Sequence, residues 1–346
     1  MTRPRRRRSA LLPLTAAAAL VLPLVAAAAP ASAADPHPVT MPAGGPFSEG
    51  TAWRLDVREA PVAQNSRAVA AGIARQTAER YGGIAAFNVD RYSTSFRTVP
   101  ADQRRVDVRW TNCQSFSFTP TGLLGEGGQF TDVPVPADAV PAAGTDGQLT
   151  IYSPSTDQLW EFWQAERKDS HWQACWGGRI DDVSRSQGRF SGTFGASASG
   201  LAVSGGTIGI EEVRRGSIEH AIALSLPELG RGTSYPASRG DGWVKGADSV
   251  KTGTRLRLPA SLDVDALDLH PVARMVAEAA QRYGFIVTDT GGCTSVVAES
   301  PAAVEAATGE DPWEELLEGT PGGTSWPGSR GRPCRPCRRT TGSPEP

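Results

Sequence analysis

The sequence predicts a mainly β protein, a single domain of the β-sandwich or jelly-roll type with two peripheral helices. Two observations lead to this prediction. Many short segments alternate apolar and polar residues and are separated by clusters of Pro, Gly, Asp and Ser, as in β-sandwiches and jelly rolls. Only two longer segments repeat apolar residues at helical spacing, and glycine follows each of them closely.

The expected elements follow one another along the chain after residue 50. Strands are expected at residues 53–57, 84–89, 105–110, 148–152, 159–164, 171–176, 188–194, 218–226, 254–258, 285–289 and 294–298. Helices are expected at residues 67–81, after the capping pair Asn65-Ser66, and at residues 269–283. Residues 193–209 are mostly Ser, Gly, Ala and Thr, and we expect turns and a small-residue strand there.

The strand at residues 218–226 is the centre of the predicted sheet. It follows the carboxylate pair Glu211-Glu212 and a turn at Gly216. Alternation predicts that one face of the strand carries Ile218, His220, Ile222 and Leu224. A histidine in such an apolar row needs a hydrogen-bond partner, so His220 is expected to have a specific role.

Residues 1–34 are predicted to be a signal peptide. Five arginines between positions 3 and 8 precede an apolar run at residues 10–29, and Ala31-Ser32-Ala33 forms a small-residue cleavage pattern. The alternative is a membrane-anchoring helix, because the apolar run approaches spanning length. Two prolines within the run favour cleavage. The protein is therefore expected to be secreted and to have no membrane contact once the signal is removed.

The rest of the chain divides into three parts. A flexible lead-in is expected at residues 35–50, a β-rich globular domain at residues 51–319 and a disordered tail at residues 320–346. The tail contains Arg, Pro and Gly with almost no apolar residue, so it cannot form a core. Because its composition changes abruptly, a frameshift in GC-rich DNA is one hypothesis for its origin, and an intact frame on resequencing would exclude it.

The part of the chain after the signal is mildly acidic. Without the five arginines of the signal, 30 basic and 37 acidic residues remain, a net charge of −7. A protein with this balance has no electrostatic footprint for nucleic acid or for an anionic membrane. We therefore expect neither of them as a partner.

Cysteines and known motifs point to no metal or cofactor. Among Cys113, Cys175 and Cys293, an exported protein would form one disulfide and leave one thiol over. The tail pair Cys334 and Cys337 lacks a second ligand pair for zinc. The chain also lacks paired histidines at zinc spacing and the G-x-S-x-G, G-x-G-x-x-G and phosphate-loop motifs.

An aromatic block is the first candidate site. It comprises Trp160, Phe162, Trp163, Trp172 and Trp176. We expect residues 159–164 and 171–176 to pair as an antiparallel hairpin that gathers these rings. Flat indole rings suit the C–H faces of sugars, so Trp160, Trp163 and Trp172 are candidate substrate contacts. The alternative is that the rings fill the core.

Carboxylates supply the candidate catalytic groups. Glu161 lies between the aromatic residues, where its pKa would be raised as a general acid requires. Glu211 and Asp289 are candidates for the second carboxylate that glycoside hydrolysis needs, and Asp241 is a candidate substrate contact. The alternative for Asp241 and Asp289 is that they cap turns beside glycines.

A third set of residues suggests elimination instead of hydrolysis. His220 or Tyr235 as a base, with Arg239 to hold a carboxylate, is the equipment of a polysaccharide lyase that acts on uronates. The alternative is that His220 is a core histidine with a satisfied hydrogen bond.

Several stretches together resemble a family of secreted proteins common in actinobacteria. They are EEVRRGSIEHAIALSLP, TSYPASRGDG, GTRLRLP, AAQRYGFIVTDTGG and, upstream, DGQLTIYSPSTDQLWEFWQA. The likeness covers roughly residues 53–299. It implies secretion and a β-rich fold and does not imply a reaction. The matching positions are Glu161, Glu211, His220, Tyr235, Asp241 and Asp289.

Together these features predict an exported protein that acts on extracellular polysaccharide, as a glycoside hydrolase or a polysaccharide lyase. The alternatives are a non-catalytic module that binds glycans with the same tryptophans and a purely structural cell-surface protein.

Overall fold

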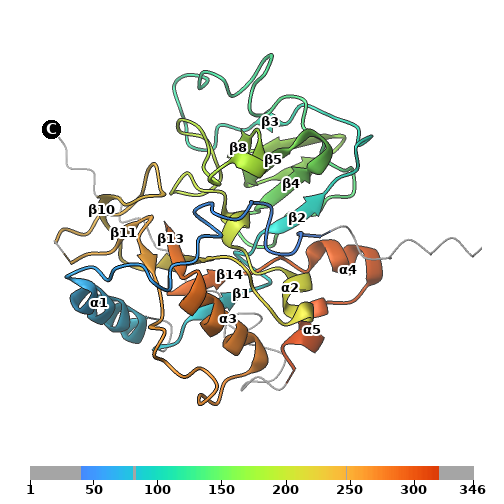
Figure 1. Ribbon diagram of the computed structural model, residues 1–346. Helices are drawn as coiled ribbons and strands as arrows, with labels where there is room; N and C mark the ends of the chain where they lie inside the picture. The colour runs from blue at the N-terminus through green and yellow to red at the C-terminus, as the bar shows by residue number, and fades with distance from the viewer. Residues whose placement is uncertain (1–39, 81–82, 247, 319–346) are drawn as a thin grey trace, which may run out of the picture. The chain divides into compact units, whose positions relative to one another are not determined.

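The computed structural model describes residues 40–80, 83–246 and 248–318, all of which belong to one unit (Figure 1). The expected signal peptide, the start of the lead-in and the whole tail lie outside these residues. None of the helices in the described ranges has the length and apolar character needed to span a bilayer.

The largest sheet has five strands and a mixed pattern. Their order is β1 (Ala86–Asn88), β14 (Ser295–Val297), β9 (Ile222–Leu226), β13 (Phe285–Thr290) and β12 (Arg255–Leu256). The neighbours β9 and β13 are parallel, whereas β14 runs antiparallel to β9. Four of the expected strands of the second half, at residues 218–226, 254–258, 285–289 and 294–298, contribute to this sheet.

Helices cover one face of this sheet. Phe87, Leu224 and Val296 point to the same face of the sheet, as alternation along strands requires. They belong to a core that also includes side chains of α1 (Ser66–Glu79) and α3 (Pro271–Arg282). Figure 1 places both helices on the same side of the sheet. These are the two helices that the periodicity predicts.

A four-stranded sheet faces the other side. It consists of β2 (Ser95–Thr98), β4 (Leu149–Ser153), β5 (Gln158–Trp163) and β8 (Trp176–Ile180), and lies in the upper half of Figure 1. Leu159 and Ile180 share a second core with Ala223 and Ile286 of the five-stranded sheet. The two larger sheets therefore pack on a common core.

Two small sheets complete the strands. The first contains β3 (Arg109–Trp110), β7 (His171–Ala174) and β6 (Glu166–Lys168), and the second pairs β10 (Gly230–Thr233) with β11 (Lys251–Thr252). Trp172 of β7 shares a third core with Trp160 and Phe162 of β5.

The predicted hairpin between residues 159–164 and 171–176 is wrong. Within the segment expected to be a loop, residues 166–168 form β6, which pairs with β7. Asp169 adopts a left-handed backbone conformation with φ of 54° at the turn between Lys168 and His171, and this makes a tight local hairpin. Strand β5 then pairs with β8 and β4 instead.

The central segment also differs from the prediction. Glu211 and Glu212 do not flank a strand but form the first turn of helix α2 (Ile210–Arg215), where carboxylates are favoured by the helix dipole. The helix ends at Gly216, whose φ of 81° gives a left-handed cap. The strand starts only at Ile222.

Two expected strands, residues 53–57 and 188–194, are not strands. Trp53 is fully buried against the segment of small residues at positions 193–209. A Cβ atom on Gly205 or Gly206 would lie 2.5 or 2.4 Å from the Trp53 ring. The small residues of this segment, which includes the short 3₁₀ helix η4 (Val203–Gly206), thus leave room for the indole.

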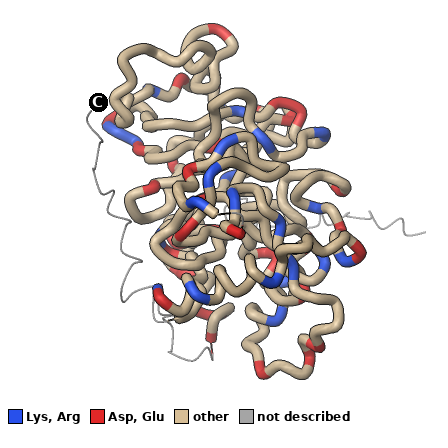
Figure 2. Tube along the Cα trace, turned by 90° about the vertical axis from the view of Figure 1, so that its left-hand side faces the viewer, with Lys and Arg blue, Asp and Glu red and all other residues tan. Residues whose placement is uncertain are grey.

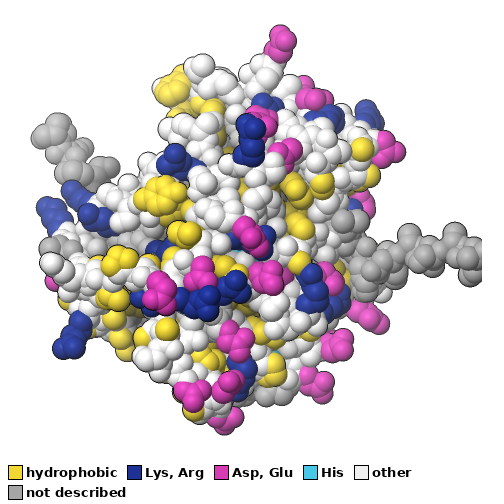
Figure 3. Space-filling model, in the orientation of Figure 1, with side chains coloured by type: hydrophobic (Ala, Val, Ile, Leu, Met, Phe, Trp, Pro, Cys, Tyr) yellow, Lys and Arg dark blue, Asp and Glu magenta, His cyan; other side chains and the backbone are white. Residues whose placement is uncertain are grey.

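The mainly β class is confirmed, and the finer assignment to a sandwich or jelly roll stays a prediction. The expectation of two helices misses three short ones, namely α2, α4 (Ala302–Thr308) and α5 (Pro312–Leu316). Charged residues of both signs are distributed along the trace and interspersed on the face shown in the space-filling view (Figures 2 and 3).

Candidate functional site

A pocket of about 750 Å³ is lined by residues of both larger sheets and of the loops around them. Its floor comes from the five-stranded sheet. Asp289 on β13 and Ser295 on β14 are both register partners of Ser225 on β9, so these three side chains lie next to one another on one face. The opposite face of the same strands carries Leu224 and Val296 of the helix-covered core.

A bulge sets the position of Asp289. The pairing of β13 with β9 shifts in register between Val287 and Asp289. Such a shift lets the strand re-aim the residue that follows it. Asp289 accepts a hydrogen bond of 2.7 Å from the backbone N–H of Ala198, which also lines the pocket.

Aromatic rings form one wall of the pocket. Trp163 and Trp176 are register partners on β5 and β8 and therefore share a face. The ring of Phe116 lies 5.4 Å from that of Trp176 and 6.0 Å from that of Phe118. Phe118 is 63% exposed. A ring that remains this open in a pocket wall can stack on a ligand.

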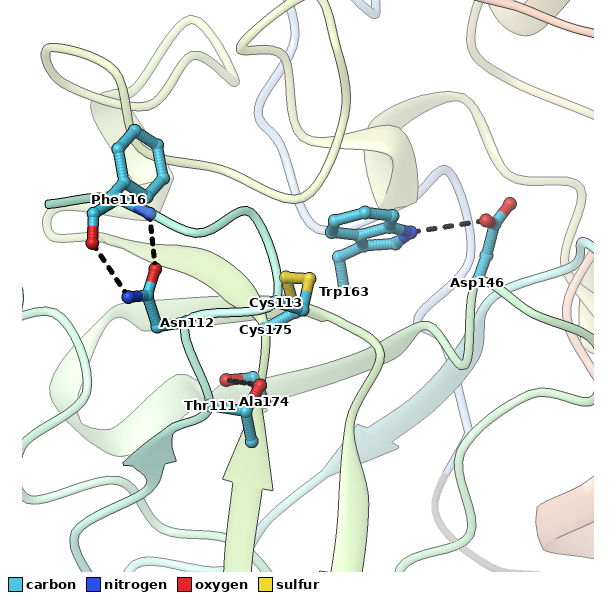
Figure 4. Close-up of a disulfide and its surroundings, with 8 residues drawn as sticks. All are labelled: Thr111, Asn112, Cys113, Phe116, Asp146, Trp163, Ala174 and Cys175. Atoms are coloured by element: carbon cyan, nitrogen blue, oxygen red, sulfur yellow. Dashed lines mark hydrogen bonds between the residues drawn. A yellow bond between two sulfur atoms is a disulfide. The ribbon is translucent and has the colours of Figure 1, made fainter. Parts of the chain in front are cut away.

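A disulfide fixes the loop that carries the phenylalanines. Cys113 is bonded to Cys175, next to the end of β7 (Figure 4). Asn112 accepts a hydrogen bond from the Phe116 N–H and donates one to the Phe116 carbonyl. Cys293 is disulfide-bonded as well, so the expectation of a thiol left over among the three cysteines is wrong.

Three carboxylates line the pocket. Asp146 accepts a hydrogen bond of 3.2 Å from the indole N–H of Trp163, which points toward it in Figure 4. Asp241 accepts one of 2.8 Å from the Thr290 hydroxyl. With Asp289 they form a set that combines the loop before β4, the loop after β10 and the end of β13.

Burial changes the acidity of two of these groups. Burial raises the pKa of Asp289 to about 6, and the charge of Asp241 adds to this increase. The hydrogen bond from the Ala198 N–H opposes it. Burial also raises the pKa of Asp146, and the hydrogen bond from Trp163 opposes that change. Asp289 therefore holds its proton in a pH range where an ordinary aspartate has lost it.

Arg239 braces the edge of the pocket. Its guanidinium donates to the carbonyls of Gly195, Ser197 and Ala198. This loop is the one whose Ala198 N–H contacts Asp289. Arg239 thus positions the donor that Asp289 uses, and its own charge is directed at the loop.

Glu161 does not line the pocket. It is 2% exposed, and its carboxylate accepts hydrogen bonds from the N–H groups of Val203 and Ser204 at 3.2 and 2.8 Å. Burial raises its pKa to about 7, as the sequence predicts, but the protein backbone occupies both oxygens. Its position behind the pocket favours a structural role.

His220 and Glu211 also lie elsewhere. His220 is fully buried, and its ring nitrogens lie 3.0 Å from a Glu212 carboxylate oxygen and 2.9 Å from the Ala221 carbonyl. Since each nitrogen faces an acceptor, the ring is doubly protonated. Glu211 forms an ion pair with Arg214 on α2.

Burial opposes the charge on both members of the buried pair, but their mutual attraction outweighs it. Burial lowers the pKa of His220, yet the Glu212 carboxylate raises it by more, so that it lies above its ordinary value. Burial likewise raises the pKa of Glu212, and the charge of His220 brings it below its ordinary value. The pair is therefore an internal ion pair. His220 thus has hydrogen-bond partners inside the core, which is what the alternative of a core histidine with a satisfied hydrogen bond predicts.

Buried carboxylates also hold the start of the described chain. Glu212 accepts a hydrogen bond from the N–H of Gly44, and Glu299 accepts hydrogen bonds from the N–H groups of Met41 and Ile210. Glu299 belongs to no motif of the sequence, yet it is 1% exposed and burial raises its pKa to about 7. This carboxylate clasp fastens residues 41–44 to the fold.

The other predicted contacts fall outside the pocket. Tyr235 is exposed and donates to Gln187. Trp160 and Trp172 are buried in the third core, which is the core alternative for these two rings. The structure therefore does not bring His220, Tyr235 and Arg239 together, nor does it bring Glu161 to the pocket.

The residues that do meet are Trp163, Arg239, Asp241 and Asp289, together with others that the sequence did not mark. The additional ones include Asp146, Phe116, Phe118, Ser225 and Ser295. One signal was available, because Asp146 opens the stretch DGQLTIYSPSTDQLWEFWQA and Ser225 and Asp289 lie in two other quoted stretches. Four of those stretches thus contribute to one pocket.

In the described ranges, no group of three or more His, Cys, Asp or Glu side chains is arranged to hold a metal ion. No protein-family model matches the chain. The comparisons with curated proteins and with solved structures also gave no match.

Proposed function

We propose that this protein is an exported glycoside hydrolase that binds extracellular polysaccharide in the pocket of about 750 Å³. One observation carries the proposal: a wall of open aromatic rings faces a floor on which Asp289 has a pKa raised to about 6. Rings stack on the apolar faces of sugars, and a carboxyl group that keeps its proton up to about pH 6 can act as the general acid of glycosidic cleavage.

The roles of the carboxylates follow from their environments. Asp289 donates its proton to the leaving glycosidic oxygen. Asp241 and Asp146 are the candidates for the second carboxylate, which activates water or attacks the sugar. Both influence the pKa of Asp289 through their charge, which supports their being near enough to act on one sugar.

Elimination has less support than hydrolysis. A lyase needs a base near a cation that neutralises a uronate, and His220 is engaged with Glu212 inside the fold. Tyr235 does not line the pocket with Arg239.

The proposal also covers the compartment and the finer fold. The disulfide between Cys113 and Cys175 suits an oxidising, extracytoplasmic compartment. We also propose that the two larger sheets are the layers of the sandwich or jelly roll, and that the chain belongs to the secreted family it resembles.

The test is a polysaccharide panel incubated with the purified protein. New reducing ends without the ultraviolet absorbance of unsaturated uronates would support hydrolysis, and both signals together would establish elimination. Retention on one polysaccharide without cleavage would instead identify a glycan-binding module, which the exposed ring of Phe118 also favours.

Matched variants test whether the pocket is the binding site. Phe118→Ala should weaken binding by about ten-fold through loss of ring stacking. Trp243→Ala, which removes another exposed aromatic ring but one outside the pocket, should leave binding unchanged. Equal losses for the two variants would show that the pocket is not the binding site.

A further inference from the structure

The pocket has an excess of negative charge. Its lining contains three acidic residues, Asp146, Asp241 and Asp289, and one basic residue, Arg239. The Arg239 guanidinium is already bound to three loop carbonyls. An anionic sugar such as a uronate would therefore meet a net repulsion here, whereas a cation would be attracted.

Two of the carboxylates have an oxygen to spare. Asp146 uses one oxygen for the Trp163 indole, and Asp241 uses one for the Thr290 hydroxyl. No described residue donates a hydrogen bond to the second oxygen of either group. Each can therefore accept a bond from a ligand without losing its partner in the protein.

The floor presents a polar group that also has no partner. Ser295 is 4% exposed and lines the pocket beside Ser225. Neither hydroxyl has a hydrogen-bond partner among the described residues. Both residues line the pocket, so their hydroxyls can form hydrogen bonds with a polar ligand there.

The aromatic wall is compatible with a cationic ligand. Trp163 lies next to Asp146, to which its indole N–H is bonded, and Phe118 is open to the pocket. An ammonium group attached to a sugar ring gains from aromatic faces as well as from carboxylates. A neutral sugar gains only the stacking.

From this arrangement we infer that the pocket selects an oligosaccharide with free amino groups, whose ammonium groups bind Asp146 and Asp241 while its rings stack on the aromatic wall. The inference rests on the proposed function, because it names the substrate class of the same pocket. The raised pKa of Asp289 is consistent with it, since burial raises that pKa most and the charges of Asp241 and Asp146 add to the increase.

The test is calorimetric titration of the full protein with three oligosaccharides. They are a glucosamine hexasaccharide, its fully N-acetylated counterpart of the same length and linkage, and a hexagalacturonate. The glucosamine compound should bind at least about ten-fold more tightly than the acetylated one, and its affinity should fall as salt is added. The galacturonate should not bind.

Variants assign the preference to the carboxylates. Asp146→Asn and Asp241→Asn keep an acceptor oxygen for Trp163 and Thr290, so the fold should be retained, which thermal unfolding checks. Each should bring the affinity for the glucosamine compound close to that for the acetylated one. The matched control is Asp169→Asn, in the exposed turn between β6 and β7, which should change nothing.

The outcomes separate the inference from the proposed function. Binding of the acetylated compound or the galacturonate as tightly as the glucosamine compound overturns the inference and leaves a glycan site in place. An unchanged preference in both pocket variants also overturns it. If none of the three binds and no panel polysaccharide is cleaved or retained, both the inference and the proposed function fail.

Discussion

Asp289 has a raised pKa and a defined hydrogen-bond donor. Its carboxylate is set by a strand bulge and by the N–H of Ala198. Both features depend on residues that are distant in the sequence. The position of the Asp289 side chain therefore depends on the pairing of β13 with β9 and on the loop that contains Ala198.

Replacing Asp289 with Asn tests its catalytic role. As the general acid it must be protonated, so kcat/KM should fall as the pH rises through about 6. Asp289→Asn should lower kcat/KM by about a hundred-fold or more and remove this dependence, whereas binding of the polysaccharide persists. A pH–rate profile unchanged in the variant would exclude Asp289 as the acid, and Asp169→Asn is the control.

Glu212 and Glu211 offer a matched pair for stability. Glu212 is buried with His220, and its neighbour Glu211 is partly exposed. Glu212→Gln leaves a buried imidazolium without its counter-ion and should cost about 3–5 kcal/mol in the free energy of unfolding. Glu211→Gln should cost less than about 1 kcal/mol. Urea denaturation measures both, and similar losses would contradict the internal ion pair.

At the scale of elements, the loop around Phe116 depends on connections to its neighbours. It is tied to the end of β7 through Cys113 and Cys175 and through a Thr111 N–H bond to the Ala174 carbonyl. The aromatic wall is thus assembled from a loop and two strands that are not consecutive in the chain.

The double substitution Cys113→Ser with Cys175→Ser should affect this wall before it affects the rest of the fold. Removing a crosslink over 62 residues should lower the free energy of unfolding by about 2–5 kcal/mol. The freed loop should also weaken glycan binding, which titration under conditions where the variant remains folded would measure. Full affinity in the folded variant would mean that the disulfide does not position the rings.

For the whole molecule, the buried acidic groups predict the pH dependence of stability. Glu161 and Glu299 have pKa values of about 7, above the ordinary 4.5. Their stabilisation is therefore full below about pH 4.5 and is lost as the pH rises through about 7, by about 3 kcal/mol each. The raised pKa of His220 acts in the same direction above about pH 6.5, whereas the lowered pKa of Glu212 acts only in acid.

The melting temperature should therefore be highest near about pH 5 and fall toward about pH 8. Glu299→Gln removes one of the responsible groups and should flatten this decline. Thermal unfolding followed by circular dichroism over this range measures both. A melting temperature that increases from about pH 5 to about pH 8 would contradict the assigned ionisation.

The sequence predicts those parts of the fold that depend on local pattern. Strands β9 and β13 and helices α1 and α3 follow from alternation or helical spacing. The hairpin failed because a two-residue turn at Asp169 competes with the longer pairing, and hydrophobic alternation does not distinguish the two. Helix α2 was missed because six residues are too few for a periodic signal.

The candidate site was predictable only in part for a related reason. Asp241, Asp289, Arg239 and Trp163 could be named from their residue types and turns, but their proximity depends on sheet order. Asp146 lies in the loop before β4 and Asp289 lies on β13, far away in the chain, so no local pattern relates them. The raised pKa of Glu161 was rightly expected, and only the structure reveals that backbone N–H groups occupy its carboxylate oxygens.

The carboxylate clasp has a consequence for how the chain is made. Met41, near the start of the described chain, is fastened to Glu299, which is 258 residues further along. Strand β1 likewise pairs with β14, near the other end. A ribosome that has produced two thirds of this protein has therefore not yet supplied the partners of its first segments. The segments around Met41 and β1 can therefore form their native contacts only after most of the chain has been made.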